Sequence, residues 1–496
     1  MLGLMNVLSF QNILAMAFGM ILGLFIGSMP GLSTTMGLAL LLPVTYGMDP
    51  ATGITMLASL FVGSHYGGSI SAILIKTPGT PSAAATALDG YPMAERGEAG
   101  KALGISLTSS IIGGIMSGIA LLTIAPLLGT IALAIGPVEM FAIVVLGMTI
   151  IGSLSTGSVI KGTLSGTIGL LLALVGMDPI TGVPRFTFGN LNLFDGIPFV
   201  VGLIGLFSIR QALKLIETDM GLRKAGKIRD RMLPTWEEFK KFRLTTIRSG
   251  IIGTIVGLIP GTGGETASWF SYNEAKRFSK EKEKFGTGHP EGIAAPEAAN
   301  SAVVGGALIP TITLGVPGST SAAVLLGGLM VHGIMPGPTL MTDYAEVTYT
   351  LMWAVLISVF FLFAFGFIYT KLSVSVTKIP SKVLAPIIVL LGVIGSYAIN
   401  NSMFDVMIMF TFGIIGYFMD KINMPVPPLV IGLILGTMLD VNLHQALIIG
   451  GSWLVFVTNP ISFILLIIAL LSLLQATPFF GWIKRGFFKN ANGNKN

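Results

Sequence analysis

Four Pro-Gly steps interrupt apolar segments of this chain, and small hydroxyl residues follow each of them. The steps are Pro30-Gly31, Pro78-Gly79, Pro260-Gly261 and Pro317-Gly318. Proline removes a backbone donor and glycine permits strained dihedral angles, so each step predicts a break in a helix. Residues of the type that caps a helix N-terminus follow the breaks: Ser33, Thr34, Thr35, Thr80, Ser82, Thr262, Ser319, Thr320 and Ser321.

Helix breaks of this kind predict an anion site. A helix N-terminus presents free N–H groups and the positive end of the helix dipole. Unwound backbone at membrane depth survives only where it is buried or lines a polar cavity. Four such ends near the membrane midplane would suit a substrate with several carboxylates. The predicted substrate-binding residues are Pro30, Gly31, Ser33, Thr34, Thr35, Lys76, Pro78, Gly79, Thr80, Ser82, Pro260, Gly261, Thr262, Gly263, Pro317, Gly318, Ser319 and Thr320.

Charged and amide side chains near the breaks extend this prediction. Lys76, just before a break, either neutralises a carboxylate or extends to a membrane interface. Glu265, Glu297 and Asn300 lie near the breaks of the second half. An ionisable group at membrane depth costs at least about 2.5–3.5 kcal/mol on insertion scales, so its presence suggests a use. These three residues are predicted coupling-ion ligands or polar anchors of the broken segments.

The residue types and motifs of the chain argue against an enzyme. Cysteine is absent, which excludes disulfides and thiolate metal sites. The four histidines, His65, His289, His332 and His444, lack metal-ligand spacing, so we interpret them as loop or packing residues. The sequence has no HExxH motif, no paired aspartates on apolar helices and no Walker loop. Ser64 and His65 are neighbours in sequence, which does not make them a catalytic dyad. We therefore expect no catalytic residues, no metal and no organic cofactor.

Composition places the chain in a membrane. It has 496 residues, of which 52% are hydrophobic and 10% charged, whereas a soluble domain carries about 25% charged residues. Several apolar segments approach or exceed the ~20 residues that cross about 30 Å of hydrocarbon. We predict an all-α polytopic membrane protein with roughly 10–14 membrane segments. The N-terminal segment has neither a basic stretch nor a cleavage site, so we interpret it as a retained helix.

Basic residues predict which loops are cytoplasmic. Of the 29 Lys and Arg residues, 16 fall between Arg210 and Lys284, and four more lie in the tail 477–496. By the positive-inside rule, the connecting loop 217–245 and this tail face the cytoplasm. A solvated basic loop that sets topology explains these charges better than nucleic-acid binding, so no nucleic-acid partner is expected.

An internal repeat divides the chain into two halves. The matching pairs are GSMPG (27–31) with GLIPG (257–261), TPGTPSAA (77–84) with VPGSTSAA (316–323), and 136–153 with 379–396. Their offsets are 230, 239 and 243 residues. We predict a first repeat over 1–216 and a second over 246–476, joined by the loop 217–245.

Charge indicates that the two repeats are inverted relative to each other. The turn near Asp49-Pro50 has no basic residue, whereas its counterpart 276–291 has five. The turn 94–101 has two basic residues, whereas its counterpart 334–346 has only acidic ones. Equivalent loops are therefore expected on opposite sides of the membrane, as in secondary transporters. An isolated Pro-Gly step would favour an ordinary proline kink, but four at repeat-equivalent positions favour a binding site.

The third break also predicts a mechanism. The two apolar arms 249–259 and 262–272 have eleven residues each, and such a helix rises about 16 Å, half of the hydrocarbon thickness. We expect a re-entrant hairpin that turns at Pro260-Gly261, with its repeat partner turning at Pro30-Gly31 from the opposite face. Moving the domain that carries both tips would alternate exposure in an elevator-like or rocking cycle.

At these motifs the chain resembles the large membrane subunit of the tripartite tricarboxylate transporters, the TctA-type family. The segments that carry the resemblance are GSMPGLSTTMGLALLLPVTYGMDP, YGGSISAILIKTPGTPSAAATALDGYPMAERGEAGKALG, DPITGVPRFTFG, DGIPFV, GLIPGTGGETAS, GIAAPEAANSAVVGGALIPTITLGVPGSTSAAVLLGGLMVHGIMPGP and PPLVIGLILGTMLDVNLHQAL. The resemblance covers nearly the whole chain. Glu265 departs from the pattern, because a small or polar residue is expected there.

The resemblance implies a bacterial inner-membrane uptake system driven by a gradient of Na⁺ or H⁺. Such systems combine this subunit with a small four-helix membrane subunit (TctB-type) and a periplasmic substrate-binding protein (TctC-type). Their substrates are citrate and other tri- or dicarboxylates. A carboxylate-selective channel and a non-tripartite carboxylate permease are the alternatives, because broken helices also line channels.

Overall fold

The computed structural model describes residues 2–154, 158–217, 228, 230–376 and 381–475. The predicted cytoplasmic tail 477–496 lies outside these residues, as do residues 218–227 and 229 of the predicted connecting loop. The chain forms two compact units, one from residues 1–132 and 200–417 and the other from residues 133–199 and 418–496. Each unit therefore takes segments from both predicted repeats.

The first unit holds the long central helices. Before the connecting loop its elements are α1 (Leu2–Val7), α2 (Phe10–Ser28), α3 (Thr34–Thr45), α4 (Pro50–Ile75), η1 (Pro81–Ala83), α5 (Ala84–Glu95), α6 (Ala99–Ala132), α9 (Phe199–Leu203), η3 (Ile204–Ile209) and α10 (Arg210–Glu217). After the loop they are α11 (Trp236–Leu258), α12 (Gly263–Phe278), η4 (Lys282–Lys284), α13 (Pro290–Leu314), α14 (Thr320–Val331), η5 (Pro338–Met341), α15 (Ala345–Val376), α16 (Ser381–Asn400) and the start of α17 (Met403–Lys421).

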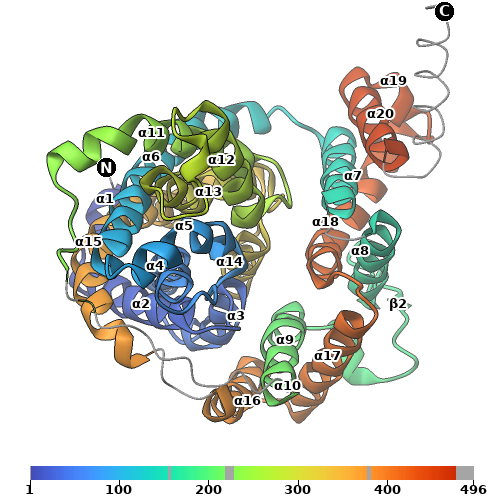
Figure 1. Ribbon diagram of the computed structural model, residues 1–496. Coiled ribbons are helices and arrows are strands. Elements are labelled where there is room, and N and C mark those ends of the chain that lie inside the picture. Colours follow the sequence, from blue (N-terminus) through green and yellow to red (C-terminus); the bar gives the residue numbers. More distant parts are fainter. Residues whose placement is uncertain (1, 155–157, 218–227, 229, 377–380, 476–496) are drawn as a thin grey trace, which may run out of the picture. The chain divides into compact units, whose positions relative to one another are not determined.

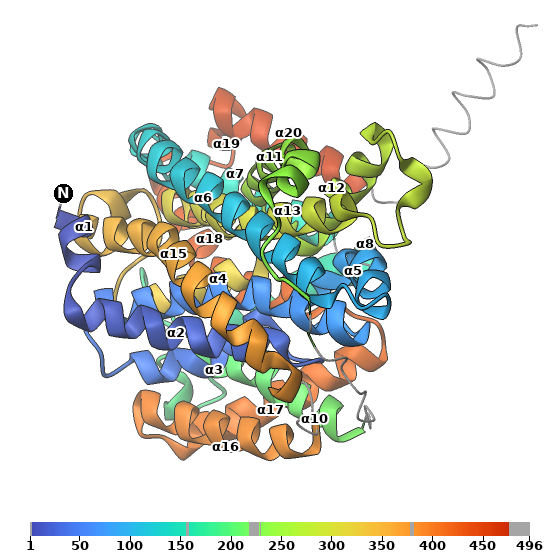
Figure 2. The same ribbon diagram turned by 60° about the vertical axis from the view of Figure 1, so that its left-hand side comes forward.

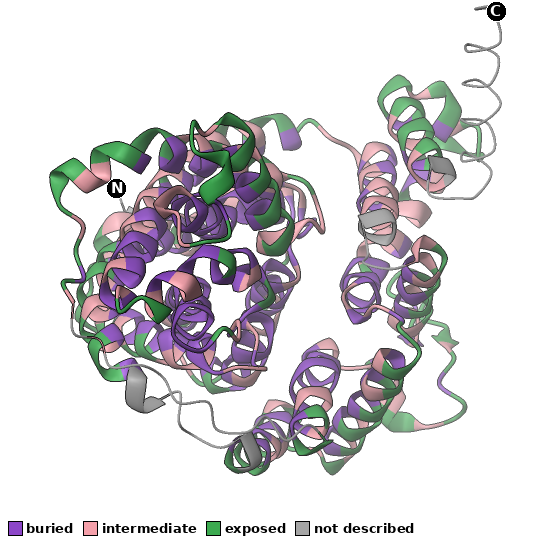
Figure 3. Ribbon diagram, in the orientation of Figure 1, coloured by how far each residue is buried: buried purple, intermediate pink, exposed green. Residues whose placement is uncertain are grey.

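Two helices, α4 and α13, form the core of this unit and are buried almost along their whole length (Figure 3). Their sequences are apolar or small on every side, which is typical of a helix enclosed by other helices. Helix α2 packs along α4, and α11 packs along α13. The packing then crosses between halves, because α6 lies against α13 and α15 lies against α4 (Figures 1 and 2).

Helix α11 is longer than the sequence predicted. It begins at Trp236, where Thr235 and Glu238 form a capping box, and it has 23 residues. The helix ends at Leu258, close to the end of the predicted apolar arm 249–259. Its added first turns carry charged residues, which the sequence analysis assigned to the connecting loop 217–245.

The second unit is smaller. Its elements are α7 (Pro137–Leu154), α8 (Val159–Ala173), β1 (Gly176–Met177), β2 (Pro184–Arg185), η2 (Leu191–Leu193), α18 (Val426–Gly450), α19 (Val455–Thr458) and α20 (Pro460–Gln475). Helix α18 packs against both α7 and α8, and α20 packs against α7.

A short hairpin, β1–β2, connects α8 to the chain beyond it. Arg185 on β2 forms an ion pair with Asp440 on α18, with 2.6 Å between Nη2 and Oδ2. It also lies 3.5 Å from Asp178, which precedes the hairpin turn. The backbone N–H groups of Ile180 and Thr181 donate to Asp178 and lower the pKa of this carboxyl to about 2. Charge and backbone bonds thus hold the hairpin in one conformation.

Among the described residues, eight helices are long and apolar enough to cross a membrane, and five shorter apolar helices accompany them. Two residue pairs form the small sheet, and helices make up nearly all the rest. The predicted all-α polytopic fold is confirmed, and the protein is a multi-pass membrane protein.

Candidate functional site

All four Pro-Gly steps lie in the first unit, and each separates two helices. Helix α2 ends at Ser28 before the first step, and α11 ends at Leu258 before the third. At both steps the glycine is left-handed, with φ of 88° at Gly31 and 80° at Gly261. Helices α4 and α13 likewise end just before the second and fourth steps. The predicted helix breaks are confirmed.

The second and fourth breaks are closed by equivalent backbone hydrogen bonds. The Gly79 N–H donates to the carbonyl oxygen of Gly68 at 3.1 Å, and the Gly318 N–H donates to that of Ala307 at 3.3 Å. Both donors and both acceptors are 239 residues apart, the offset of the matching TPGTPSAA and VPGSTSAA segments. Each bond folds the broken segment back onto its own preceding helix.

The same two glycines approach a neighbouring helix closely. A Cβ atom on Gly79 would lie 1.9 Å from the carbonyl oxygen of Gly27 on α2. A Cβ atom on Gly318 would lie 2.4 Å from the carbonyl oxygen of Gly257 on α11. A side chain at either position would therefore separate the break from the helix beside it.

Contacts join the breaks to one another. The Thr35 and Ser321 hydroxyls, after the first and fourth breaks, are 3.0 Å apart. The Gly261 N–H donates to the Gly318 carbonyl at 3.0 Å, which joins the third break to the fourth. Near the start of α12, a Cβ on Gly264 would lie 3.3 Å from the Cβ of Ser82, after the second break. The structure thus brings all four predicted segments together.

Two of the hydroxyl residues cap helices as predicted. The Ser33 Oγ accepts a hydrogen bond from the Met36 N–H at 3.2 Å, at the start of α3. The Ser319 Oγ accepts from the Ala322 N–H at 3.1 Å, at the start of α14. Each cap satisfies one of the free N–H groups and fixes the direction of the helix N-terminus.

The other two breaks use their hydroxyl groups differently. The Thr262 hydroxyl donates to the Val256 carbonyl at 2.5 Å, so it closes the end of α11 instead of capping α12. The capping prediction was wrong at this residue. The Thr80 hydroxyl lies 3.1 Å from that of Ser82 and makes no cap bond. Neither hydroxyl occupies an N–H group at the start of the helix that follows.

The two charged residues closest to the breaks are exposed. The Lys76 ammonium lies 5.3 Å from the centre of the Tyr91 ring on α5, the geometry of a cation–π contact. Glu265 lies in the first turn of α12, where a carboxylate is favoured by the helix dipole.

Glu297 on α13 has a very different environment. Its side chain is fully buried and accepts hydrogen bonds from four hydroxyl groups. Ser69 on α4 donates at 2.5 Å, Ser106 and Ser110 on α6 donate at 2.8 and 3.2 Å, and Thr86 on α5 also donates. The three serine hydroxyls donate to Oε2, and the Thr86 hydroxyl donates to Oε1. Glu297 therefore anchors α13 to three helices of the first half.

Asn300 lies one turn beyond Glu297 and contacts a histidine. Its Nδ2 donates to the His65 carbonyl oxygen at 3.2 Å, and its buried Oδ1 has no hydrogen-bond partner among the described residues. We interpreted His65 as a loop or packing residue, yet the structure places it beside the start of α12. The sequence did offer one signal for this placement: His65 is a histidine within the apolar segment that leads to the second break.

Asp89 on α5 is a second residue that the sequence analysis did not single out. It is fully buried and accepts bonds from the N–H groups of Gly286, Gly288 and His289, at 2.7 to 2.9 Å. The Tyr272 hydroxyl donates to its other oxygen at 2.9 Å. Asp89 thus fixes the loop that enters α13, and its position inside an otherwise uncharged helical turn was the available indication.

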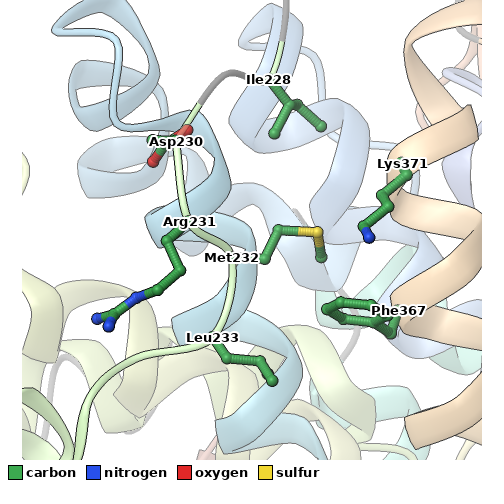
Figure 4. A pocket seen from close by; sticks show the side chains of 7 residues that line it. All are labelled: Ile228, Asp230, Arg231, Met232, Leu233, Phe367 and Lys371. Carbon is green, nitrogen blue, oxygen red and sulfur yellow. The ribbon is translucent and has the colours of Figure 1, made fainter.

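A cavity of about 580 Å³ lies elsewhere in the first unit (Figure 4). It is lined by Ile228, Asp230, Arg231, Met232, Leu233, Phe367 and Lys371. None of these residues belongs to the four breaks. Asp230 accepts bonds from the Gly100 and Lys101 N–H groups and so caps the start of α6. The cavity therefore borders a structural contact and does not coincide with the predicted site.

Comparisons with known proteins show the family of the chain. The chain is 38% identical over 473 residues to an "Uncharacterized 52.8 kDa protein in TAR-I ttuC' 3'region" of Agrobacterium vitis, covering 95% of this chain and 94% of that protein. It is 36% identical over 225 residues to an "Uncharacterized protein in TAR-II ttuC' 3'region" of the same organism, covering 45% of this chain and 93% of that protein. No solved structure matches. The model of the tripartite tricarboxylate transporter TctA family matches residues 13–431, and the chain belongs to this transporter family.

Proposed function

We propose that the protein is the large membrane subunit of a tripartite secondary transporter that imports small carboxylates with a cation gradient. The observation that carries this proposal is the meeting of four helix breaks in one unit. Tri- and dicarboxylates such as citrate are the substrate class, because helix N-termini and hydroxyl groups suit several carboxylates at once.

The binding residues in this proposal are those that follow the breaks. Ser33 and Ser319 orient two helix N-termini through their caps, and the Thr35–Ser321 contact keeps these ends together. The third break offers the start of α12, where the Thr262 hydroxyl is turned back to α11 and leaves the first N–H groups uncapped by it. Partial charges of this kind bind an anion without a buried lysine or arginine.

The inverted repeat belongs to the same proposal. It is supported by the repeat-equivalent bonds at Gly79 and Gly318, by the crossed packing of α6 and α15, and by the opposite charge of equivalent loops. Two opposed breaks at one midplane site would give each membrane face its own access route. Movement of the unit that carries them would then alternate exposure.

The family supports two partners, a small membrane subunit of the TctB type and a periplasmic binding protein of the TctC type. The bacterial inner membrane is the proposed location, with the basic loop 217–245 in the cytoplasm. Cysteine labelling tests this orientation cleanly, because the chain has no cysteine. A Lys240→Cys variant should label from the cytoplasm and an Asp343→Cys variant from the periplasm. Labelling of both from one side would contradict the inverted repeat.

Uptake of radiolabelled citrate by cells that express all three subunits tests the function. Gly79→Ala should abolish uptake, because the new Cβ would collide with the Gly27 carbonyl. Gly47→Ala is the matched control, since nothing lies within 4 Å of a Cβ there. Citrate counterflow by the wild-type protein would distinguish a carrier from a channel. Wild-type uptake by the Gly79→Ala variant would overturn the site assignment.

A further inference from the structure

Three side chains from different elements converge at the first turn of α12. A Cβ atom on Gly264 would lie 2.4 Å from Asn300 Oδ1 on α13 and 3.4 Å from His65 Nε2 on α4. Ser82 of η1 lies beside the same point. Only glycine leaves room for this convergence, which joins the second and third breaks.

The hydrogen bonds of His65 define its chemistry. Its Nδ1 lies 3.0 Å from the carbonyl oxygen of Phe61. A carbonyl oxygen only accepts, so Nδ1 carries the hydrogen, and in the neutral ring Nε2 is left with a lone pair. His65 therefore presents a base toward the start of α12.

Asn300 presents a second acceptor to the same place. Its Nδ2 is committed to the His65 carbonyl, which fixes the orientation of the amide. Its Oδ1 then faces the start of α12, buried and without a hydrogen-bond partner among the described residues. A buried acceptor without a donor is energetically unfavourable. One proton on His65 Nε2 would change a lone pair into a donor near the start of α12, the point at which this oxygen also lies.

The surrounding ionisable groups are already engaged. Glu297 on α13 accepts bonds from four hydroxyls, Asp89 on α5 accepts bonds from backbone N–H groups, and the Tyr66 hydroxyl is bonded to that of Thr370 on α15. Tyr369 on α15 bonds Ser28 on α2, and Glu265 on α12 is exposed. Asn300 Oδ1 is enclosed. A proton can therefore reach this oxygen, whereas a substrate carboxylate is too large to do so.

We propose that His65 carries the coupling proton of the transport cycle, with Asn300, which is bonded to the His65 carbonyl, as the neighbouring acceptor at the start of α12. The inference rests on the proposed carboxylate transport and deepens it by naming the ion. The imidazole takes one H⁺ at Nε2 from the outer face and releases the same H⁺ to the inner face. Protonation of His65 would thereby add a positive charge at the point where the second and third breaks meet.

The test measures citrate transport by the complete three-subunit system in a pH series, with and without a protonophore and with and without Na⁺. His65→Gln should abolish pH-dependent accumulation but retain citrate counterflow, because exchange needs no net release of the proton. Asn300→Asp should raise the pH midpoint of uptake by about one unit or more, since a nearby carboxylate favours the imidazolium.

His444→Gln is the matched control, because His444 Nδ1 makes the same 3.0 Å contact with a carbonyl four residues earlier. It should keep the wild-type pH profile. An unchanged profile in His65→Gln, or wild-type uptake that depends on Na⁺ and not on pH, would overturn the inference and leave carboxylate transport standing. If the wild-type system transports neither citrate nor any other di- or tricarboxylate, the proposed function itself fails.

Discussion

Glu297 and Glu265 lie on helices that pack against each other, α13 and α12, yet their surroundings are opposite. Glu297 is enclosed by hydroxyl groups from α4, α5 and α6, whereas Glu265 is exposed in the first turn of its helix. The first carboxylate joins the two halves, whereas the second makes no hydrogen bond or ion pair with any residue that the structure describes. The two carboxylates, both predicted from sequence as coupling-ion ligands or polar anchors, thus differ in the donors that surround them.

The largest effect is expected for Glu297→Ala, which leaves four buried hydroxyls without their acceptor. We expect a loss of more than about 4 kcal/mol of unfolding free energy, measured as thermal unfolding of the purified protein in detergent. Glu297→Gln keeps the shape and one carbonyl oxygen, so it should be destabilised less and allow the comparison even if the alanine variant fails to fold. Equal unfolding temperatures for wild type and Glu297→Ala would contradict the anchoring role.

A smaller effect is expected for Thr86→Val, which removes one of the four donors and preserves the shape of the side chain. Hydrogen bonds to charged groups contribute about 1.5–3 kcal/mol, so we expect a loss near 2 kcal/mol in the same unfolding measurement. Thr313→Val is the matched control, because this buried hydroxyl donates only to the Ile309 carbonyl of its own helix. Similar losses of unfolding free energy in both variants would mean that the hydrogen bond from Thr86 to the carboxylate stabilises the protein no more than a hydroxyl-to-backbone bond does.

The smallest effect is expected for Glu265→Gln. The helix-dipole interaction that it weakens contributes about 0.3–1 kcal/mol at an exposed position, so stability and citrate uptake should stay close to wild type. Uptake assays at matched protein levels check this. A complete loss of uptake with normally folded protein would contradict this expectation and support Glu265 as a coupling-ion ligand.

The features that sequence reasoning predicted share one property: they are local. Pro-Gly steps break helices through their own backbone chemistry, and apolar length predicts spans without reference to partners. The environment of Glu297 depends instead on Ser69, 228 residues away, and on α6. The roles of His65 and Asp89 depend likewise on residues of the second half. A single sequence carries no indication of these distant contacts.

The boundary of α11 was missed for a different reason. Its first turns carry the basic residues Lys240, Lys241 and Arg243, which hydropathy assigns to a loop. Only the Thr235–Glu238 capping box marked the true start. For this segment, the basic charges predict the side of the membrane, whereas the capping box predicts where the helix begins. A basic segment can therefore be helical.

The breaks are lined by hydroxyls and backbone, and Lys76, the one basic residue in them, lies over the Tyr91 ring. In the proposed function, such a site would hold an anion by partial charges without cancelling its charge. Each negative charge moved inward against a potential that is negative inside requires about 2.3 kcal/mol of electrical work per 100 mV. The membrane voltage would therefore oppose entry of a fully ionised tricarboxylate unless each cycle carried inward at least as many monovalent cations as the substrate has negative charges. The neutrality of the breaks thus makes transport current, and its sign, a direct measure of ion stoichiometry.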